Sequence, residues 1–218
     1  MLPIYLDNNA TTRTDPAVLA AMLPFFTEQA LLGAEHSHEI VFTSGGTESN
    51  NAAILSALDA RPGRSDVIVS AVEHPAVLSL VQALEKRRGI GVRRVPVDGN
   101  GRLDLEAYRA ALGPDVAIAS IMWANNETGV LFPVAELAEM ARASGVLFHT
   151  DAVQAVGQLR IDLKSTAIDM LSLSGHKING PKGIGVLYLR KGVRFHPLIV
   201  GGKQERGRRA GTENVPAI

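Results

Sequence analysis

The sequence predicts an α/β fold in which a mostly parallel sheet is covered by helices on both faces. Two observations support this prediction: short apolar runs rich in β-forming residues recur along the chain, and amphipathic stretches with helix start signals lie between them. Strands that alternate with helical segments are typical of parallel sheets. The 218 residues, of which 46% are hydrophobic, suit one domain or a domain and a half.

Seven apolar runs are predicted to be strands. In chain order they cover residues 39–44, 66–70, 92–97, 116–124, 146–151, 170–174 and 185–190. The stretches between them carry helix start signals at Asp15-Pro16, Thr47 with Glu48, Pro75, Asp104 and Pro133. The Gly/Arg-rich run at 201–214 is a marked change in composition, and we expect it to be a surface loop.

The composition argues against several classes of function. Lys plus Arg and Asp plus Glu both total 22, so no overall basic field favours nucleic acid or an anionic membrane. No apolar run approaches the ~20 residues of a membrane helix, and the N-terminus lacks the order of a secretory signal, so a cytoplasmic protein is expected. The chain has no cysteine, which excludes disulfides and a thiolate zinc site, and we expect no metal.

Polar clusters follow several of the predicted strands, at the edge where open α/β sheets bind ligands. The stretch "TSGGTES" at 43–49 follows a strand and opens a helix. The backbone N–H groups of Gly45, Gly46 and Thr47 would therefore face one anion together with the positive end of the helix dipole. An ordinary glycine turn with a threonine cap is the alternative. Neither a Walker loop nor a dinucleotide fingerprint is present, so nucleotides are disfavoured.

Further polar residues lie at other strand ends, and each has a structural alternative. Asp151 could cap a helix, His74 could be structural, and Asn125 and Asn126 could satisfy a turn. Gln154 would face the same site as Asp151 if a helical turn begins there. The remaining residues belong to "SGHKINGPKG", in which Ser174, His176 and Lys177 precede a turn-forming Asn-Gly-Pro.

One cofactor uses all of these groups. Pyridoxal phosphate needs a lysine for its Schiff base, a carboxylate facing the pyridinium nitrogen and an anion cup for its phosphate. A lysine serves only if its amine can lose its proton, which positive charge nearby and partial burial favour. We therefore predict pyridoxal 5'-phosphate as the cofactor and Lys177 as its lysine.

The chain resembles the class V, fold-type I pyridoxal-phosphate enzymes and, within them, the cysteine desulfurases. The motifs that carry this resemblance are "YLDNNATT" at 5–12, "FTSGGTESNN" at 42–51, "EHPAV" at 73–77, "WANNETG" at 123–129, "FHTDAVQAVG" at 148–157, "LSGHKINGPKGIG" at 173–185 and "GGKQERGRRAGTEN" at 201–214. The wording of "AMLPFFTEQ" at 21–29 and "VEHPAVLSL" at 72–80 is similar to the nitrogen-fixation type.

The resemblance implies a role for each matching residue. Lys177 would hold the cofactor and move the α-proton, Asp151 would pair with the ring nitrogen, and His74 would stack on the ring and relay protons. Gln154 and Asn126 would hold ring substituents. The remaining assignments are phosphate binding by Gly46, Thr47, Ser174 and His176, a contact from Thr212 to the phosphate of the neighbouring subunit in a homodimer, and a border of the substrate pocket at Asn8 and Asn9.

The chain also departs from the family pattern. By that pattern we expect a loop and helix to be missing near residues 29–30, and the C-terminal small domain that would supply the catalytic cysteine is not in the chain. We expect residues 1–14 to border the active site and residues 15–218 to form the large cofactor-binding domain. The implied reaction converts L-cysteine to L-alanine and a persulfide, with an iron–sulfur scaffold or another acceptor protein as partner. A selenocysteine lyase, another class V aminotransferase or lyase, and an inactive dimerisation module are the alternatives.

Overall fold

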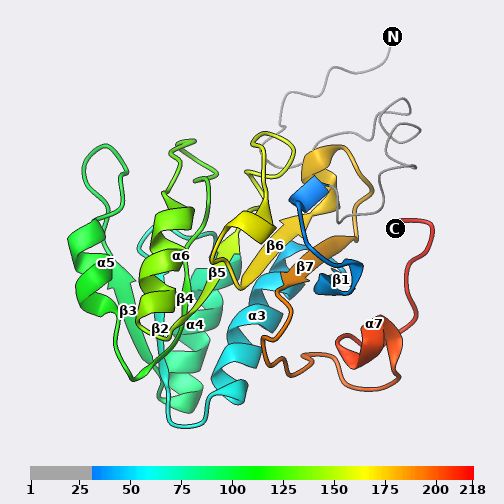
Figure 1. Ribbon diagram of the computed structural model, residues 1–218, viewed down its shortest axis with the longest axis horizontal. Coiled ribbons are helices and arrows are strands. Elements are labelled where there is room, and N and C mark those ends of the chain that lie inside the picture. Colours follow the sequence, from blue (N-terminus) through cyan, green and yellow to red (C-terminus); the bar gives the residue numbers. More distant parts are fainter. Residues whose placement is uncertain (1–30) are drawn as a thin grey trace.

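The computed structural model describes residues 31–218, which form a seven-stranded sheet in the order β1-β7-β6-β5-β4-β2-β3 (Figure 1). The strands are β1 (Ile40–Thr43), β2 (Asp66–Ser70), β3 (Gly91–Val95), β4 (Val116–Ser120), β5 (Leu147–Asp151), β6 (Met170–Ser174) and β7 (Gly185–Leu189). Strand β7 is antiparallel to both neighbours, and the other pairs are parallel. The predicted mostly parallel sheet is therefore confirmed, and every strand except β7 points its carboxyl end to one edge.

The helices begin close to the predicted start signals. They are α3 (Gly46–Ala60), α4 (Pro75–Arg88), α5 (Leu105–Ala111), α6 (Val134–Ala143) and α7 (Gln204–Gly207), with 3-10 turns η2 (Ser37–Glu39), η3 (Leu163–Ser165) and η4 (Gly175–Ile178). At the start of α5 the Asp104 carboxylate accepts a hydrogen bond from Ala107 N at 2.9 Å, which caps the helix. The signal at Asp15-Pro16 lies outside the described residues.

Helices cover both faces of the sheet (Figure 1). Neighbouring residues of β2 show the two faces, because Val67 and Val69 join the core cluster under α3 and α4 whereas Ile68 joins the cluster under α5 and α6. Side chains of a strand alternate between faces, so a run that is apolar at every position is buried on both sides. No helix among residues 31–218 is long and apolar enough to span a bilayer.

Two predictions differ clearly from the structure. Strand β4 ends at Ser120 rather than at 124, although Ile121 and Trp123 still donate backbone hydrogen bonds to β5 at 3.0 and 2.9 Å. The run at 201–214 is mostly exposed as expected, but it contains α7 and is anchored, since Glu205 accepts a hydrogen bond from Phe42 N in β1 at 3.2 Å. Distant side chains, which local patterns do not reveal, fix this loop.

Candidate functional site

A cavity of about 450 Å³ opens at the carboxyl edge of the sheet. Its walls come from the N-termini of α3 and α4, the ends of β5 and β6, the loop after β4 and the turn η4. Every predicted cofactor residue except Thr212 lines it: Gly46, Thr47, His74, Asn126, Asp151, Gln154, Ser174, His176 and Lys177. Residues from five separate sequence motifs thus converge on one site of the size that small ligands use.

One end of the cavity is suited to an anion. The first turn of α3 contributes Gly46 and Thr47, and N–H groups in a first turn have no partner within the helix. A Cβ on Gly46 would lie 2.8 Å from Val153 Cγ2 and 3.6 Å from Ser174 Cβ, so only glycine fits this close approach. Gly45 contributes less than predicted, because its N–H turns toward Thr43 Oγ1 at 3.4 Å.

Side chains from β6 and η4 complete this end. Ser174 Oγ lies 3.3 Å from His176 Nδ1, so the hydroxyl and the ring form one polar group beside Gly46. Burial lowers the pKa of His176, and the charges of Lys177 and Lys182 lower it further. A neutral ring that is still able to donate a hydrogen bond suits a phosphate neighbour.

Asp151 ends β5 and is held by two hydrogen bonds. Its Oδ1 accepts from Val153 N at 3.0 Å, and its Oδ2 accepts from the amide of Asn50 at 2.6 Å. The side chain is buried, and burial raises the pKa of the carboxyl even though both hydrogen bonds act to lower it. A cationic partner would stabilise the ionised form of a buried carboxylate of this kind.

Sequence reasoning missed two residues behind Asp151. Asn50 lies on the sheet side of α3 and leaves its buried Oδ1 without a partner among the described residues. Glu73 is also buried: its Oε1 accepts from Ser70 Oγ at 2.5 Å and from Met122 N at 2.9 Å, and its Oε2 has no described partner. Burial raises the pKa of Glu73 to about 8, and the charge of Asp151 adds to this. Asn50 lies in the motif at 42–51 and Glu73 in the motif at 73–77, and membership of these motifs was the signal that could have identified them.

His74 caps α4 and faces the cavity. Its Nδ1 accepts a hydrogen bond from Ala76 N at 3.1 Å, so the neutral ring carries its proton on Nε2. The structural role considered for this histidine is therefore real, and it coexists with a position on the cavity wall. The cap also fixes the orientation of the ring.

The two neighbouring asparagines have different environments. Asn125 Oδ1 accepts from Glu127 N, Thr128 N and Thr128 Oγ1, which is the turn-satisfying role. Asn126 instead lines the cavity. Gln154 also reaches it, because a helical turn follows Asp151, with Val156 N bonded to Ala152 O at 3.0 Å.

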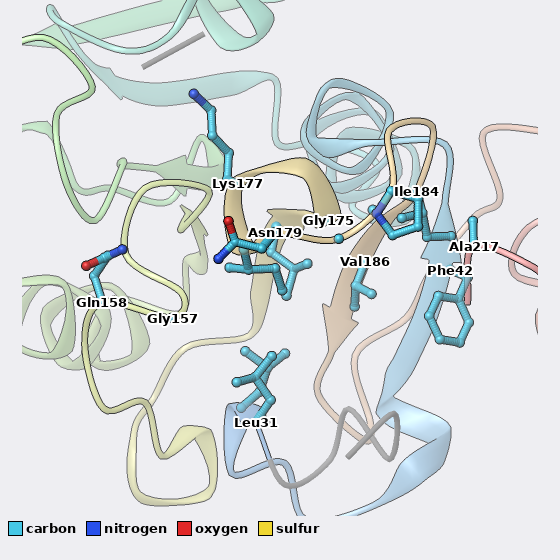
Figure 2. A pocket seen from close by; sticks show the side chains of 16 residues that line it. Leu31, Phe42, Gly157, Gln158, Gly175, Lys177, Asn179, Ile184, Val186 and Ala217 are labelled. Carbon is cyan, nitrogen blue, oxygen red and sulfur yellow. The ribbon is translucent and has the colours of Figure 1, made fainter. Parts of the chain in front are cut away.

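Lys177 lies in η4, which separates this cavity from a second, apolar one of about 310 Å³. Figure 2 shows its side chain pointing away from Leu31, Val186 and Phe42 of the apolar cavity. The turn ends at Asn179, whose positive φ of 63° is tolerated by asparagine. Lys182, the rival lysine of the same motif, is exposed and lines neither cavity.

One predicted residue lies at another site, and two lie outside the described part of the chain. Thr212 lines a separate hollow next to Ser44, Gly183 and Arg209. Asn8 and Asn9 lie outside the described residues, as do the predicted segment 1–14 and the junction at 29–30. The substrate contacts assigned to these asparagines stay predictions.

The residues present fit pyridoxal phosphate. Gly46 forms a cradle that a Cβ would fill, at the helix end where a phosphate would lie. The buried Asp151 suits a pyridinium nitrogen, and Lys177 offers an amine to the same space. The helix end at Gly46, the carboxylate of Asp151 and the amine of Lys177 thus line different parts of one cavity.

Comparison with known proteins agrees with this arrangement. A cysteine desulfurase from Sinorhizobium fredii is 62% identical, over 100% of this chain and 63% of the relative, and the cysteine desulfurase NifS of Azotobacter vinelandii is 57% identical, over 100% and 60%. A solved NifS-like protein has a TM-score of 0.91 at 36% identity, over 99% of this chain and 67% of the other. A chain described as SspA in complex with cysteine has a TM-score of 0.90 at 34% identity, over 99% and 70%.

The alignment covers the whole of this chain but only part of the curated relatives. The chain spans about three fifths of their length. The model of the aminotransferase class-V family matches residues 28–218. The predicted resemblance is confirmed, and the chain belongs to the aminotransferase class-V family.

Proposed function

We propose that this protein is a pyridoxal-phosphate-dependent cysteine desulfurase. The observation that carries the proposal is the convergence of Lys177, Asp151 and the N-terminus of α3 on one cavity. The names of the curated relatives support it, as does the structural relative described in complex with cysteine. The reaction would transfer the sulfur of L-cysteine to a protein thiol, leaving L-alanine and a persulfide, for iron–sulfur cluster assembly.

The cavity residues would hold the cofactor in one orientation. Gly46, Thr47, Ser174 and His176 would bind its phosphate, and Asp151 would pair with the ring nitrogen. When bound, pyridoxal phosphate supplies an electron sink that acidifies the α-proton of an attached amino acid. Asn126 and Gln154 would contact ring substituents, which leaves the face of the ring to His74.

Protons would be handled by two side chains. Lys177 would bind the cofactor covalently through its Nζ and, once displaced by substrate, would accept and return the α-proton. His74 would present its Nε2 proton to the cavity, because Nδ1 is occupied by Ala76 N–H. Asp151 would be ionised beside the positive ring nitrogen, whose charge would reverse the rise in pKa that burial causes.

Other parts of the reaction need groups outside the cavity. The chain contains no cysteine, so the thiol that receives sulfur would lie outside these 218 residues, in the predicted small domain. Thr212 would contact the cofactor of a second subunit in a homodimer. Asn8 and Asn9 would border bound L-cysteine, and an iron–sulfur scaffold in the cytoplasm would accept the sulfur. A role in nitrogen fixation is consistent with the similarity to NifS.

Chemical trapping tests the assignment of Lys177. The protein is incubated with pyridoxal phosphate, reduced with borohydride and digested, and the modified peptide is located by mass spectrometry. We expect the adduct on Lys177, because this side chain lines the cavity whereas Lys182 is exposed. Lys182→Ala is the matched control and should keep the adduct; an adduct on Lys182 of the unchanged protein would refute the assignment.

A further inference from the structure

The anion-binding end of the cavity carries a negative charge of its own. Glu48 lies in the first turn of α3, two residues after Gly46, and its side chain is only 10% exposed. Its Oε2 accepts a hydrogen bond from Ser44 N at 2.9 Å, which holds the chain before the helix. A carboxylate stabilises a helix N-terminus, but it also repels any second anion bound there.

An arginine from a distant part of the chain pairs with this carboxylate. Arg209 Nε lies 2.9 Å from Glu48 Oε1, and its Nη2 lies 3.3 Å from Oε2, so the contact is bidentate. Burial raises the pKa of Glu48, but hydrogen bonds from Arg209 and Ser44 outweigh this and lower it overall, which leaves the carboxyl ionised. The arginine is 23% exposed, so solvent screens the pair only partly.

The pair lies beside the cavity without entering it. Neither side chain lines the 450 Å³ cavity, whereas Gly46 and Thr47 of the same helical turn do. An effect of the pair on a ligand would therefore act through charge and through the position of the helix end. The acidic neighbours Glu205 and Glu213 also act on Arg209, so the arginine lies among several carboxylates, and Arg206 shares in balancing Glu205.

We propose that Arg209 neutralises Glu48 and so keeps the N-terminus of α3 attractive to the phosphate of the cofactor. The proposal rests on the proposed function, because it concerns the affinity of the same site. Arg209 is a positioning and charge-balancing residue, and Glu48 holds the helix entry at Ser44. A purely structural pair would hold the loop 203–213 in place and would leave the discrimination between phosphorylated and unphosphorylated ligands unchanged.

A double-mutant cycle separates these two roles. Absorbance titrations with pyridoxal 5'-phosphate would compare the unchanged chain with Arg209→Ala, Glu48→Gln and the double variant. We expect Arg209→Ala to weaken binding about tenfold, the order expected for unit charges several ångström apart near a protein surface. The double variant should recover most of this loss, because the bare carboxylate is gone. Glu48→Gln alone should bind as tightly as the unchanged chain, or more tightly.

Three further measurements make the test decisive. Pyridoxal, which lacks the phosphate, should show little difference among the four proteins, and added salt should shrink the differences seen with pyridoxal phosphate. If Arg209→Ala does not fold, Arg209→Gln and the sign of the Glu48→Gln effect carry the test. A double variant as weak as Arg209→Ala, or a weaker Glu48→Gln, would overturn the proposal. An unchanged chain that does not bind pyridoxal phosphate, or does not prefer it over pyridoxal, would instead overturn the proposed function.

Discussion

Two buried polar groups on β5 differ in how completely the protein satisfies the polar atoms around them. His149 and Asp151 are two residues apart and so face the same side of the sheet. His149 Nδ1 lies 2.8 Å from Ser120 Oγ and its Nε2 lies 2.9 Å from Ser172 Oγ, with all three side chains fully buried. Around Asp151, by contrast, buried oxygens remain unpaired.

Two of the buried unpaired atoms in the described part of the chain lie near Asp151 and the open cavity. Asn50 Oδ1 and Glu73 Oε2 have no partner within residues 31–218, and Asp151 itself faces a cavity that a ligand can enter. A complete hydrogen-bond row stabilises the sheet, whereas an incomplete one costs free energy unless a ligand completes it. The comparison teaches that burial alone does not separate the two residues: both are buried, but His149 has both ring nitrogens paired, whereas Asp151 faces a cavity and has unpaired oxygens beside it.

The largest expected effect concerns Asp151, whose surroundings contain the unpaired oxygens. Asp151→Asn should leave the cofactor attached but slow the exchange of the α-proton of a bound amino acid roughly 10²- to 10³-fold. The reason is that a neutral partner no longer stabilises a charged ring nitrogen. Deuterium exchange followed by proton NMR measures the rate, with Asp162→Asn as a control on another carboxylate. Unchanged exchange would assign the pairing to another residue.

A smaller effect is expected at His149, whose ring nitrogens are both paired. His149→Leu should lower the free energy of unfolding by about 2–4 kcal/mol, because the buried hydroxyls of Ser120 and Ser172 would lose their common partner. Urea denaturation measures this loss. Replacing both serines by alanine in the same variant should recover part of the stability. If it recovers none, the loss comes from packing and the hydrogen-bond row is not the cause.

The pH dependence of stability is the smallest expected effect when it is counted per pH unit. The pKa of Glu73, about 8 in the folded protein, exceeds its ordinary value of 4.5, so the folded state keeps a proton that the unfolded state releases. The contribution of Glu73 to the free energy of unfolding should therefore fall as pH rises between these values, at up to ~1.4 kcal/mol per pH unit. The pKa of His149 is lowered to about 3, so its contribution is lost as pH falls from 6.5 toward that value.

A single substitution isolates the alkaline part of this profile. Glu73→Gln cannot ionise, so the decline above pH 6.5 should flatten, and below pH 6.5 the rise with pH that belongs to His149 should be steeper because Glu73 no longer offsets it. Urea denaturation between pH 4 and pH 9 measures both sides. An alkaline slope that survives in the glutamine variant would mean that another group, such as Asp151 with its own raised pKa, causes the decline.

Much of the fold and site follows from local patterns. The strand ranges are correct to within a few residues, because alternation of apolar runs and capping residues such as Asp104 act over one or two turns. The polar residues at strand ends were predicted as one site for a related reason. Parallel strands send their carboxyl ends to one edge, so Asp151, His74 and Lys177 had to lie near one another.

Other properties depend on which distant segments pack together. Local turn patterns do not distinguish Asn125 from Asn126, although the family resemblance did, and they do not show that Glu73 is buried near Asp151. Both properties depend on how the loop after β4 lies over β2. The contact between Glu48 and Arg209 joins residues 161 positions apart, and no local pattern contains it. By itself the sequence determined the strands, the helix starts and the chemical types at the sheet edge, since these are set by neighbours along the chain. Only the tertiary structure decided which polar groups are satisfied, because hydrogen-bond partners and burial are contributed by residues remote in sequence.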